Sequence, residues 1–126
     1  MSVRVLIVDD HRLFAEALEA MFERDPRIEV VGIAGEGHSG VRLALERRPD
    51  VVLMDLSMPL MGGLQATREI RRQWPQACVL ILSGSGTKQD IARSLAAGAR
   101  GYVTKGNIGT ELIEAVLECG VEERTA

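Results

Sequence analysis

Aromatic residues are scarce in this chain of 126 residues, which has 2 Phe, 1 Trp and 1 Tyr although 46% of its residues are hydrophobic. We therefore expect an aliphatic core built from Val, Leu, Ile and Ala. An excess of positive charge is also lacking, since 15 Lys and Arg face 18 Asp and Glu and the formal net charge is -3. Because neutralising a phosphate backbone requires clustered positive charge, we expect no nucleic-acid binding through this chain.

Only two cysteines occur, Cys78 and Cys119, and they form no CxxC pair. Their spacing excludes the disulfide framework of a small secreted domain and the ligand pattern of a zinc ribbon. We expect Cys78 to be a small core residue and Cys119 to lie near a helix end, both in a reducing cytosol.

Long hydrophobic runs are absent as well. The N-terminal apolar run from Val3 to Val8 contains Arg4 and is followed by two aspartates. This run is far shorter than the roughly 20 residues of a membrane span, and it does not form the apolar segment of a signal peptide. The sequence therefore predicts a cytoplasmic protein that makes no membrane contact.

Short β-branched segments alternate along the chain with longer segments of helical period, as in one α/β domain of ordinary size. The strand segments are almost continuously apolar, which is typical of parallel strands covered by helices on both faces. The expected strands are Val3–Val8, Ile28–Ala34, Val51–Asp55, Cys78–Ser83 and Gly101–Val103.

Five helices are expected between and after these strands. In the first, an apolar stripe should join Leu13, Phe14, Ala17, Leu18, Met21 and Phe22. The others are expected over Gly37–Arg48, Gly63–Trp74, Thr87–Ala97 and Asn107–Cys119, with Thr87 as an N-terminal cap, Gly98 as a C-terminal cap, and Ile108 on the buried stripe of the last helix. We expect the domain to span residues 1–119 and residues 120–126 to form a frayed polar tail or the start of a linker.

Five βα units with right-handed crossovers predict a flavodoxin-like (βα)5 doubly wound parallel sheet with the strand order 2-1-3-4-5. Proteins with such sheets bind ligands beyond the carboxyl ends of the strands. The residues that follow each strand are therefore the candidates for function.

Polar side chains follow four of the five strands. Asp9 and Asp10 follow the first strand, Asp55 ends the third, Ser83 ends the fourth, and Lys105 follows the fifth. Three close carboxylates repel one another, and a cation would relieve the repulsion. Because the candidate ligands are hard oxygen atoms, they indicate Mg²⁺ or Mn²⁺ rather than zinc or copper.

A carboxylate beside Mg²⁺ is also a candidate nucleophile toward a phosphoryl group, whose oxygens a lysine and a hydroxyl could then bind. Each residue alone has a plain structural reading. Asp10 could cap the first helix, Asp55 could be a turn residue before Pro59, and Lys105 could be an ordinary surface lysine. Their joint occurrence at successive strand ends favours the site.

Several segments also match the signature blocks of a known family. The chain resembles the response-regulator receiver domain (CheY-like) over about residues 3 to 118, and it looks most like the receivers of NarL/FixJ (LuxR)-type two-component transcriptional regulators. The matching segments are Val5–His11 with Arg12-Leu13-Phe14 after it, Asp55–Pro59 with Gly62-Gly63-Leu64 after it, Leu82-Ser83-Gly84, and Gly98–Lys105.

This resemblance implies a phosphorylation switch. Asp55 would accept a phosphoryl group from a sensor histidine kinase, and Ser83 and Lys105 would bind its oxygens. Ser83 and Tyr102 would be the switch residues that remodel the surface of the fourth helix, fifth strand and fifth helix. A homodimer could form on phosphorylation. The implied Mg²⁺ ligands are Asp9, Asp10, Asp55 and the backbone carbonyl of Ser57.

Other functions fit the sequence less well. A Mg²⁺-dependent phosphatase with an aspartyl-phosphate intermediate would need a second acid two residues after Asp55, where Ser57 stands. A nucleotide or flavin binder would need a glycine-rich turn after the first strand. We therefore expect no enzyme beyond a domain that catalyses its own phosphorylation and dephosphorylation. His11 and His38 lack metal-ligand spacing, and His11 is read as a polar residue at a helix start.

Overall fold

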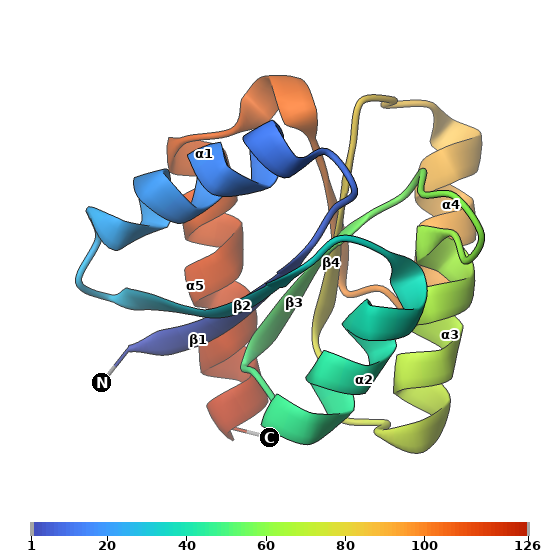
Figure 1. Cartoon of the computed structure of the whole chain (residues 1–126), viewed down its shortest axis with the longest axis horizontal. Coiled ribbons are helices and arrows are strands. Elements are labelled where there is room, and N and C mark those ends of the chain that lie inside the picture. Colours follow the sequence, from blue (N-terminus) through green and yellow to red (C-terminus); the bar gives the residue numbers. More distant parts are fainter. Residues whose placement is uncertain (1, 126) are drawn as a thin grey trace.

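Five parallel strands form one sheet in the order β2-β1-β3-β4-β5 (Figure 1). The computed structural model describes residues 2–125, and residues 121–125 by their backbone alone. This sheet confirms the predicted fold class and strand order, and only the bounds of β4 and β5 differ, by one residue each. The strands are β1 (Val3–Val8), β2 (Ile28–Ala34), β3 (Val51–Asp55), β4 (Val79–Ser83) and β5 (Gly101–Thr104).

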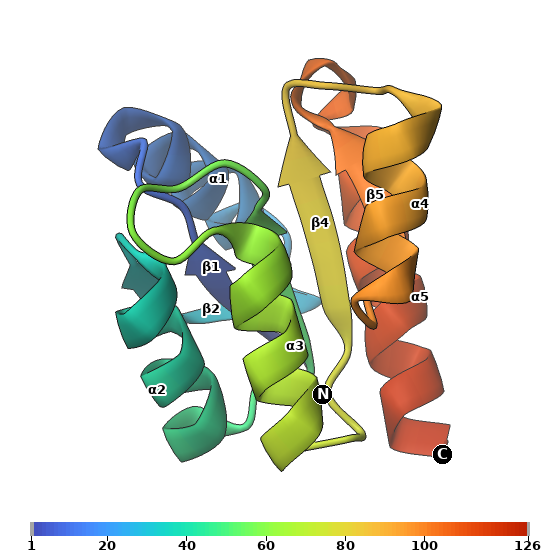
Figure 2. The same ribbon diagram turned by 90° about the vertical axis from the view of Figure 1, so that its right-hand side faces the viewer.

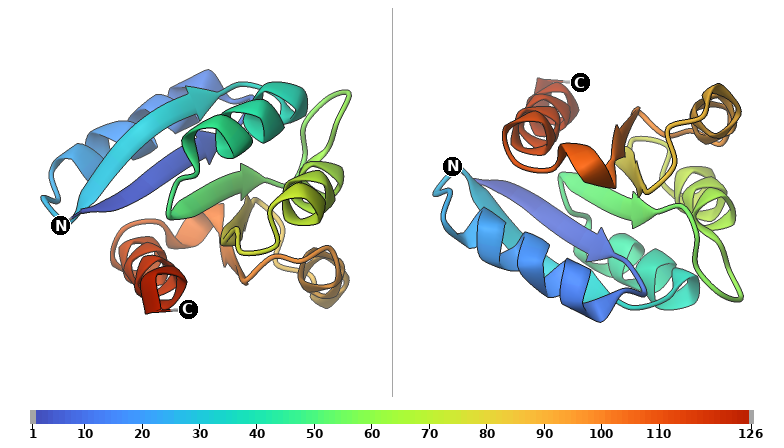
Figure 3. Two further views of the ribbon diagram at one scale, coloured as in Figure 1. Left: turned by 90° about the horizontal axis from the view of Figure 1, so that it is seen from below. Right: turned by 90° about the horizontal axis from the view of Figure 1, so that it is seen from above.

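Helices cover both faces of the sheet. Helices α1 and α5 lie on one face and α2, α3 and α4 on the other (Figure 3). The predicted caps of α4 are confirmed, because the Thr87 hydroxyl accepts a hydrogen bond from the Asp90 amide at 3.2 Å and Gly98 follows with a φ of +109°. The helices are α1 (Arg12–Glu23), α2 (Gly37–Arg47), α3 (Gly63–Gln73), α4 (Lys88–Ala96), the short 3-10 helix η1 (Lys105–Asn107) and α5 (Thr110–Thr125).

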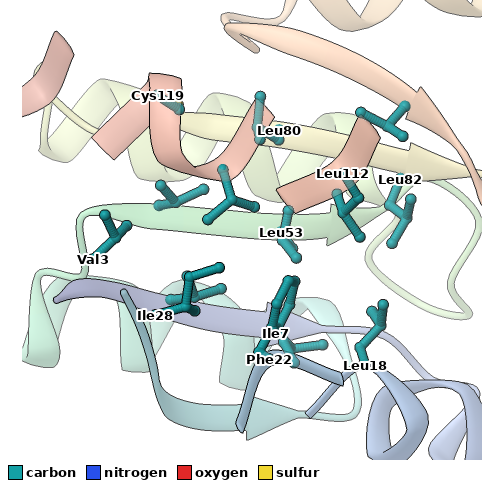
Figure 4. Close-up of a cluster of buried hydrophobic side chains, with 14 of the residues drawn as sticks. Val3, Ile7, Leu18, Phe22, Ile28, Leu53, Leu80, Leu82, Leu112 and Cys119 are labelled. Carbon is teal, nitrogen blue, oxygen red and sulfur yellow. The ribbon is translucent and has the colours of Figure 1, made fainter. Parts of the chain in front are cut away.

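The core consists of two aliphatic layers, because successive side chains of a strand point to opposite faces of the sheet. In β3, Leu53 packs in the layer beneath α1 and α5, and Met54 packs in the layer beneath α2 and α3. Figure 4 shows the first layer, where Phe22 of α1 and Leu112 of α5 meet the sheet. Each fully buried side chain of this kind contributes about 1.5–3 kcal/mol to folding.

The apolar stripe of α1 differs from the prediction. Ala15, Leu18 and Phe22 are its buried residues, whereas Ala17 is exposed and 82% of the surface of Leu13 is accessible to solvent. The face toward the sheet follows positions 15, 18 and 22, whose spacing of three and four keeps them on one side of a helix. Leu13 lies outside this line.

The last helix also differs from the prediction at both ends. It starts at Thr110 because Gly109 adopts a φ of +101°, and this leaves Ile108 43% exposed, outside the helix. It continues past Gly120 to Thr125, so residues 121–125 are helical. Gly120 suits this position, since a Cβ atom there would lie 2.7 Å from the Val3 side chain of β1.

The two cysteines differ from the prediction, which was two separate thiols. Cys78, just before β4, and Cys119 of α5 form a disulfide with their Cα atoms 6.5 Å apart. Both residues are buried, and Cys119 lies beside Leu80 in the layer beneath α5 (Figure 4). The sequence pattern could not indicate this pair, because only the packing of α5 on the sheet brings Cys119 to the start of β4.

No helix between residues 2 and 125 is both long and apolar enough to cross a membrane.

Gly63, the first residue of α3, is packed directly against the end of β3. Its amide donates a hydrogen bond to the Leu56 carbonyl at 3.0 Å. A Cβ atom on Gly63 would overlap the backbone carbonyl of Asp55 and lie 2.9 Å from the Leu56 Cα atom, whereas one on Gly62 would meet only the Leu56 carbonyl, at 3.7 Å. A side chain at position 63 would therefore have to push backbone aside.

We expect Gly63→Ala to lower the free energy of unfolding by about 1–3 kcal/mol, because overpacking against backbone forces the helix away from the strand. The matched variant Gly62→Ala should change it by less than about 0.5 kcal/mol. Urea denaturation followed by circular dichroism measures both. Equal stabilities of the two variants would contradict the tight contact at Gly63.

Candidate functional site

Three carboxylates meet at the carboxyl ends of β1 and β3. Val8 of β1 pairs with Met54 of β3, so the next residues, Asp9 and Asp55, stand beside each other. Both are 3% exposed, whereas Asp10 is more accessible. The chain also leaves β3, β4 and β5 at this same end of the sheet (Figure 2). The structure thus brings the three predicted aspartates together.

The side chain of Lys105 contacts the two buried carboxylates. Its Nζ atom lies 3.0 Å from Asp9 Oδ2 and 3.4 Å from Asp55 Oδ1. The ammonium also lies 4.5 Å from the centre of the Phe14 ring, which is a cation–π distance. Lys105 is positioned by β5, whose residue Thr104 pairs with Ser83 of β4. Phe14 was read from sequence only as part of an apolar stripe, and it also borders the site.

Ser83 and Ser57 border the same hollow as Asp55. This cavity, of about 600 Å³, is open to the surface and also touches Lys105. Ser83 is buried, and its Oγ atom accepts a hydrogen bond from the Ser85 amide at 3.1 Å. The hydroxyl therefore keeps its own hydrogen for donation to a ligand. Ser57 is exposed in the loop after β3.

Tyr102 of β5 is connected to the loop that follows Ser83. Its hydroxyl donates a hydrogen bond to the carbonyl of Ser85. The ring is half-buried and packs against the core layer beneath α2 and α3. Ser85 therefore links the two predicted switch residues, since its amide bonds to Ser83 and its carbonyl to Tyr102.

His11 is a residue of this site that the sequence reading missed. Its Nδ1 atom lies 3.1 Å from Asp9 Oδ1, 3.3 Å from Asp10 Oδ1 and 3.7 Å from Asp55 Oδ2. The signal in the sequence is its position directly after the candidate ligands Asp9 and Asp10, and no spacing between histidines indicates it. His38, the second histidine, lies on α2.

Burial and repulsion together raise the pKa of Asp55. The carboxylate is desolvated and lies beside Asp9, and these two effects outweigh the favourable charge of Lys105, so the pKa rises from 3.8 to about 6. The charged form of Asp55 is thus held in an unfavourable environment. A perturbed acid in a cleft is a common property of functional sites.

The acidic cluster fits a divalent cation. The Oδ2 atom of Asp55 is buried and accepts no hydrogen bond from any residue within the described range 2–125. An unpartnered buried carboxylate oxygen is costly, and a bound cation would supply its partner. One ligand atom from each of Asp9, Asp10, His11 and Asp55 can be chosen so that all lie within 4.8 Å of one another. Carboxylate oxygens favour Mg²⁺ and Mn²⁺.

Fold and site together define a class of protein: a CheY-like α/β domain with a flavodoxin fold and an acidic pocket at the carboxyl end of its parallel sheet. The family model described as "Response regulator receiver domain" matches residues 5–117. The chain belongs to this family, as the sequence motifs predicted.

Known proteins of the same kind are similar over nearly the whole chain. The transcriptional regulatory protein LiaR of Bacillus subtilis is 39% identical over 114 residues, which are 90% of this chain and 54% of LiaR. A two-component response regulator of the LuxR family from Aurantimonas sp. SI85-9A1 has a TM-score of 0.92 at 35% identity, covering 97% of this chain and 87% of that chain.

The signal receiver domain of the response regulator NarL from Mycobacterium tuberculosis has a TM-score of 0.90 at 34% identity, covering 94% of this chain and 96% of that chain. These relatives confirm the resemblance to receivers of the LuxR and NarL type. The chain spans about half the length of the curated relatives it matches.

The raised pKa of Asp55 predicts a pH-dependent stability in metal-free buffer. Because the folded chain binds this proton more tightly than the unfolded chain, the free energy of unfolding falls as the pH rises from about 4 to above 6. At pH 7.5 we expect Asp55→Asn to be more stable than the wild type by about 2–3 kcal/mol, because a tenfold difference in proton affinity corresponds to about 1.4 kcal/mol. Urea denaturation in EDTA from pH 4.5 to 7.5 measures this difference.

Asp25 provides a control of opposite sign. Hydrogen bonds from Arg27 lower its pKa to about 2, so Asp25→Asn should lose stability at neutral pH. A stability difference between Asp55→Asn and the wild type that stays constant across this pH range would contradict the raised pKa of Asp55.

Proposed function

We propose that this domain is a switch that accepts a phosphoryl group on Asp55 from a sensor histidine kinase. One observation carries the proposal: the buried carboxylate of Asp55 opens into a cavity, with Lys105 at one oxygen and no hydrogen bond at the other from the described residues. A buried acid with a free oxygen and a cation beside it is arranged to act as a nucleophile. Membership in the receiver family supports this role.

In the transfer, a carboxylate oxygen of Asp55 forms a bond to phosphorus. The bond between phosphorus and the donor histidine nitrogen breaks, and the electron pair returns to that nitrogen. Lys105 balances the negative charge gained at the carboxylate and the phosphoryl oxygens, and the Ser83 hydroxyl donates to one of those oxygens. Mg²⁺ or Mn²⁺, held by Asp9, Asp10, Asp55 and the Ser57 carbonyl, would neutralise the remaining charge.

A phosphatase acting on other substrates is the alternative. Such an enzyme would need a general acid near Asp55 to protonate a leaving group. Ser57 stands two residues later, and its hydroxyl is a poor acid. We therefore infer that the domain catalyses only its own phosphorylation and dephosphorylation.

Phosphorylation would be transmitted through Ser85. When Ser83 turns toward the phosphoryl group, the Ser85 amide loses its acceptor and the loop shifts, and this displaces the carbonyl that holds the Tyr102 hydroxyl. Tyr102 lies on β5, so the change would reach the surface formed by α4, β5 and α5. The new hydrogen bonds bias two states of similar free energy.

Membership in the family also supports a proposal about the wider setting. The relatives include transcriptional regulators, so we propose that residues 1–119 are the receiver part of a cytoplasmic transcriptional response regulator. Its partners would be a sensor histidine kinase and, on phosphorylation, a second copy, without nucleic-acid or membrane contact through these residues.

Incubation with Mg²⁺ and acetyl phosphate should add one base-labile phosphoryl group to the chain, detected by intact mass. We expect Asp55→Asn to abolish the adduct, because the amide is not a nucleophile, and EDTA to abolish it in the wild type. Asp25→Asn, which removes a carboxylate just after the C-terminal end of α1, should leave the adduct unchanged. If no adduct and no release of inorganic phosphate above background occur, the proposal is wrong.

Tyr102 is the single tyrosine of the chain, so fluorotyrosine labelling gives one fluorine resonance that reports its environment. We expect this resonance to shift when Asp55 is phosphorylated and to stay in place in Asp55→Asn. In Ser83→Ala the chain should still gain the phosphoryl group, but the shift should fall to less than about half, because the link through Ser85 is lost. A full shift in Ser83→Ala would contradict the proposed route.

A further inference from the structure

The ring of His11 is turned into the acidic cluster although its position favours another role. His11 is the N-terminal cap residue of α1, where a side chain usually accepts a hydrogen bond from the helix. Its ring makes no such bond. The Nδ1 atom instead faces Asp9, Asp10 and Asp55 at 3.1, 3.3 and 3.7 Å.

These distances match the spacing of ligand atoms around one small ion. A six-coordinate ion with ligands at about 2.1 Å holds neighbouring ligand atoms about 3 Å apart and opposite ones about 4.2 Å apart. The ligand atoms of the four residues lie within 4.8 Å of one another, so an ion would have to draw the farthest pair together by at most about 0.6 Å. A second observation also indicates an ion. The buried Oδ2 atom of Asp55 accepts no hydrogen bond from the described residues. It lies 3.7 Å from His11 Nδ1, which is too far for a hydrogen bond between them.

We propose that His11 Nδ1 is an additional protein ligand at this site and that it determines which ion binds. The inference rests on the proposed function, since the aspartates are the same. Imidazole nitrogen is a good ligand for Ni²⁺ and a weaker one for Mn²⁺, which also accepts oxygen ligands, whereas Mg²⁺ prefers oxygen and retains its waters. His11 therefore raises the affinity for transition-metal ions and contributes little to the binding of Mg²⁺.

Another reading makes His11 only a hydrogen-bond partner of Asp9, since Asp9 Oδ1 also accepts the His11 amide hydrogen at 2.8 Å. In that case the ring orients a carboxylate without touching the ion. Removing it would then change the affinities for all ions by the same factor, or by none. The two readings differ in ion selectivity.

The test is calorimetric titration of the full chain with MgCl₂, MnCl₂ and NiCl₂ at pH 7.5. In His11→Ala we expect the affinity for Ni²⁺ to fall on the order of tenfold or more, that for Mn²⁺ to fall several-fold, and that for Mg²⁺ to change less than about twofold. His11→Gln should behave like His11→Ala, because it keeps a polar side chain but replaces the ring nitrogen with a hard amide oxygen. His38→Ala is the matched control and should change none of the three affinities.

Pulsed electron paramagnetic resonance of the Mn²⁺-loaded chain adds a direct signature. Coupling of the ion to a ring nitrogen is expected in the wild type and in His38→Ala, and it should vanish in His11→Ala. Equal losses for all three ions, or none, in His11→Ala overturn the role of His11. Asp10→Asn separates the two proposals, because unchanged binding of all three ions in that variant overturns the ion site itself.

Discussion

Asp9 and Asp55 stand side by side with both carboxylates buried, because β1 and β3 pair in register where the strand order of the sheet reverses. Like charges at this separation in a desolvated place repel, and the raised pKa of Asp55 reflects it. Lys105 contacts both carboxylates and offsets part of the repulsion. His11 also contacts both acids, at 3.1 Å from Asp9 Oδ1 and 3.7 Å from Asp55 Oδ2.

This arrangement of two buried acids lowers the stability of the folded chain. The folded chain holds Asp55 in an environment that its charged form does not favour, and the close contact of Gly63 with the Asp55 carbonyl fixes the end of β3 in place. A bound cation would relieve the repulsion that folding creates. Local departures from optimal stability of this kind are expected at functional sites. The aliphatic layers on both faces of the sheet supply the stability that offsets it.

Much of the fold was predictable, because the signals are local. Apolar segments such as Val51–Asp55 indicate buried parallel strands by their composition alone, and Thr87 and Gly98 mark helix ends through backbone geometry that few residues favour. The positions of Asp9, Asp55, Ser83 and Lys105 were predictable as well. In a parallel sheet all strands end at the same edge, so residues far apart in sequence must converge there.

The sequence by itself therefore determined the strand order, the convergence of the aspartates with Lys105, and the family. Only the tertiary structure decided which face of α1 is buried, where α5 begins and ends, and that Cys78 meets Cys119. It also decided the direction of the His11 ring. These features depend on how a helix is rotated and seated on the sheet, or on which rotamer its surroundings allow. The identity of a residue and its spacing to others carry no such information.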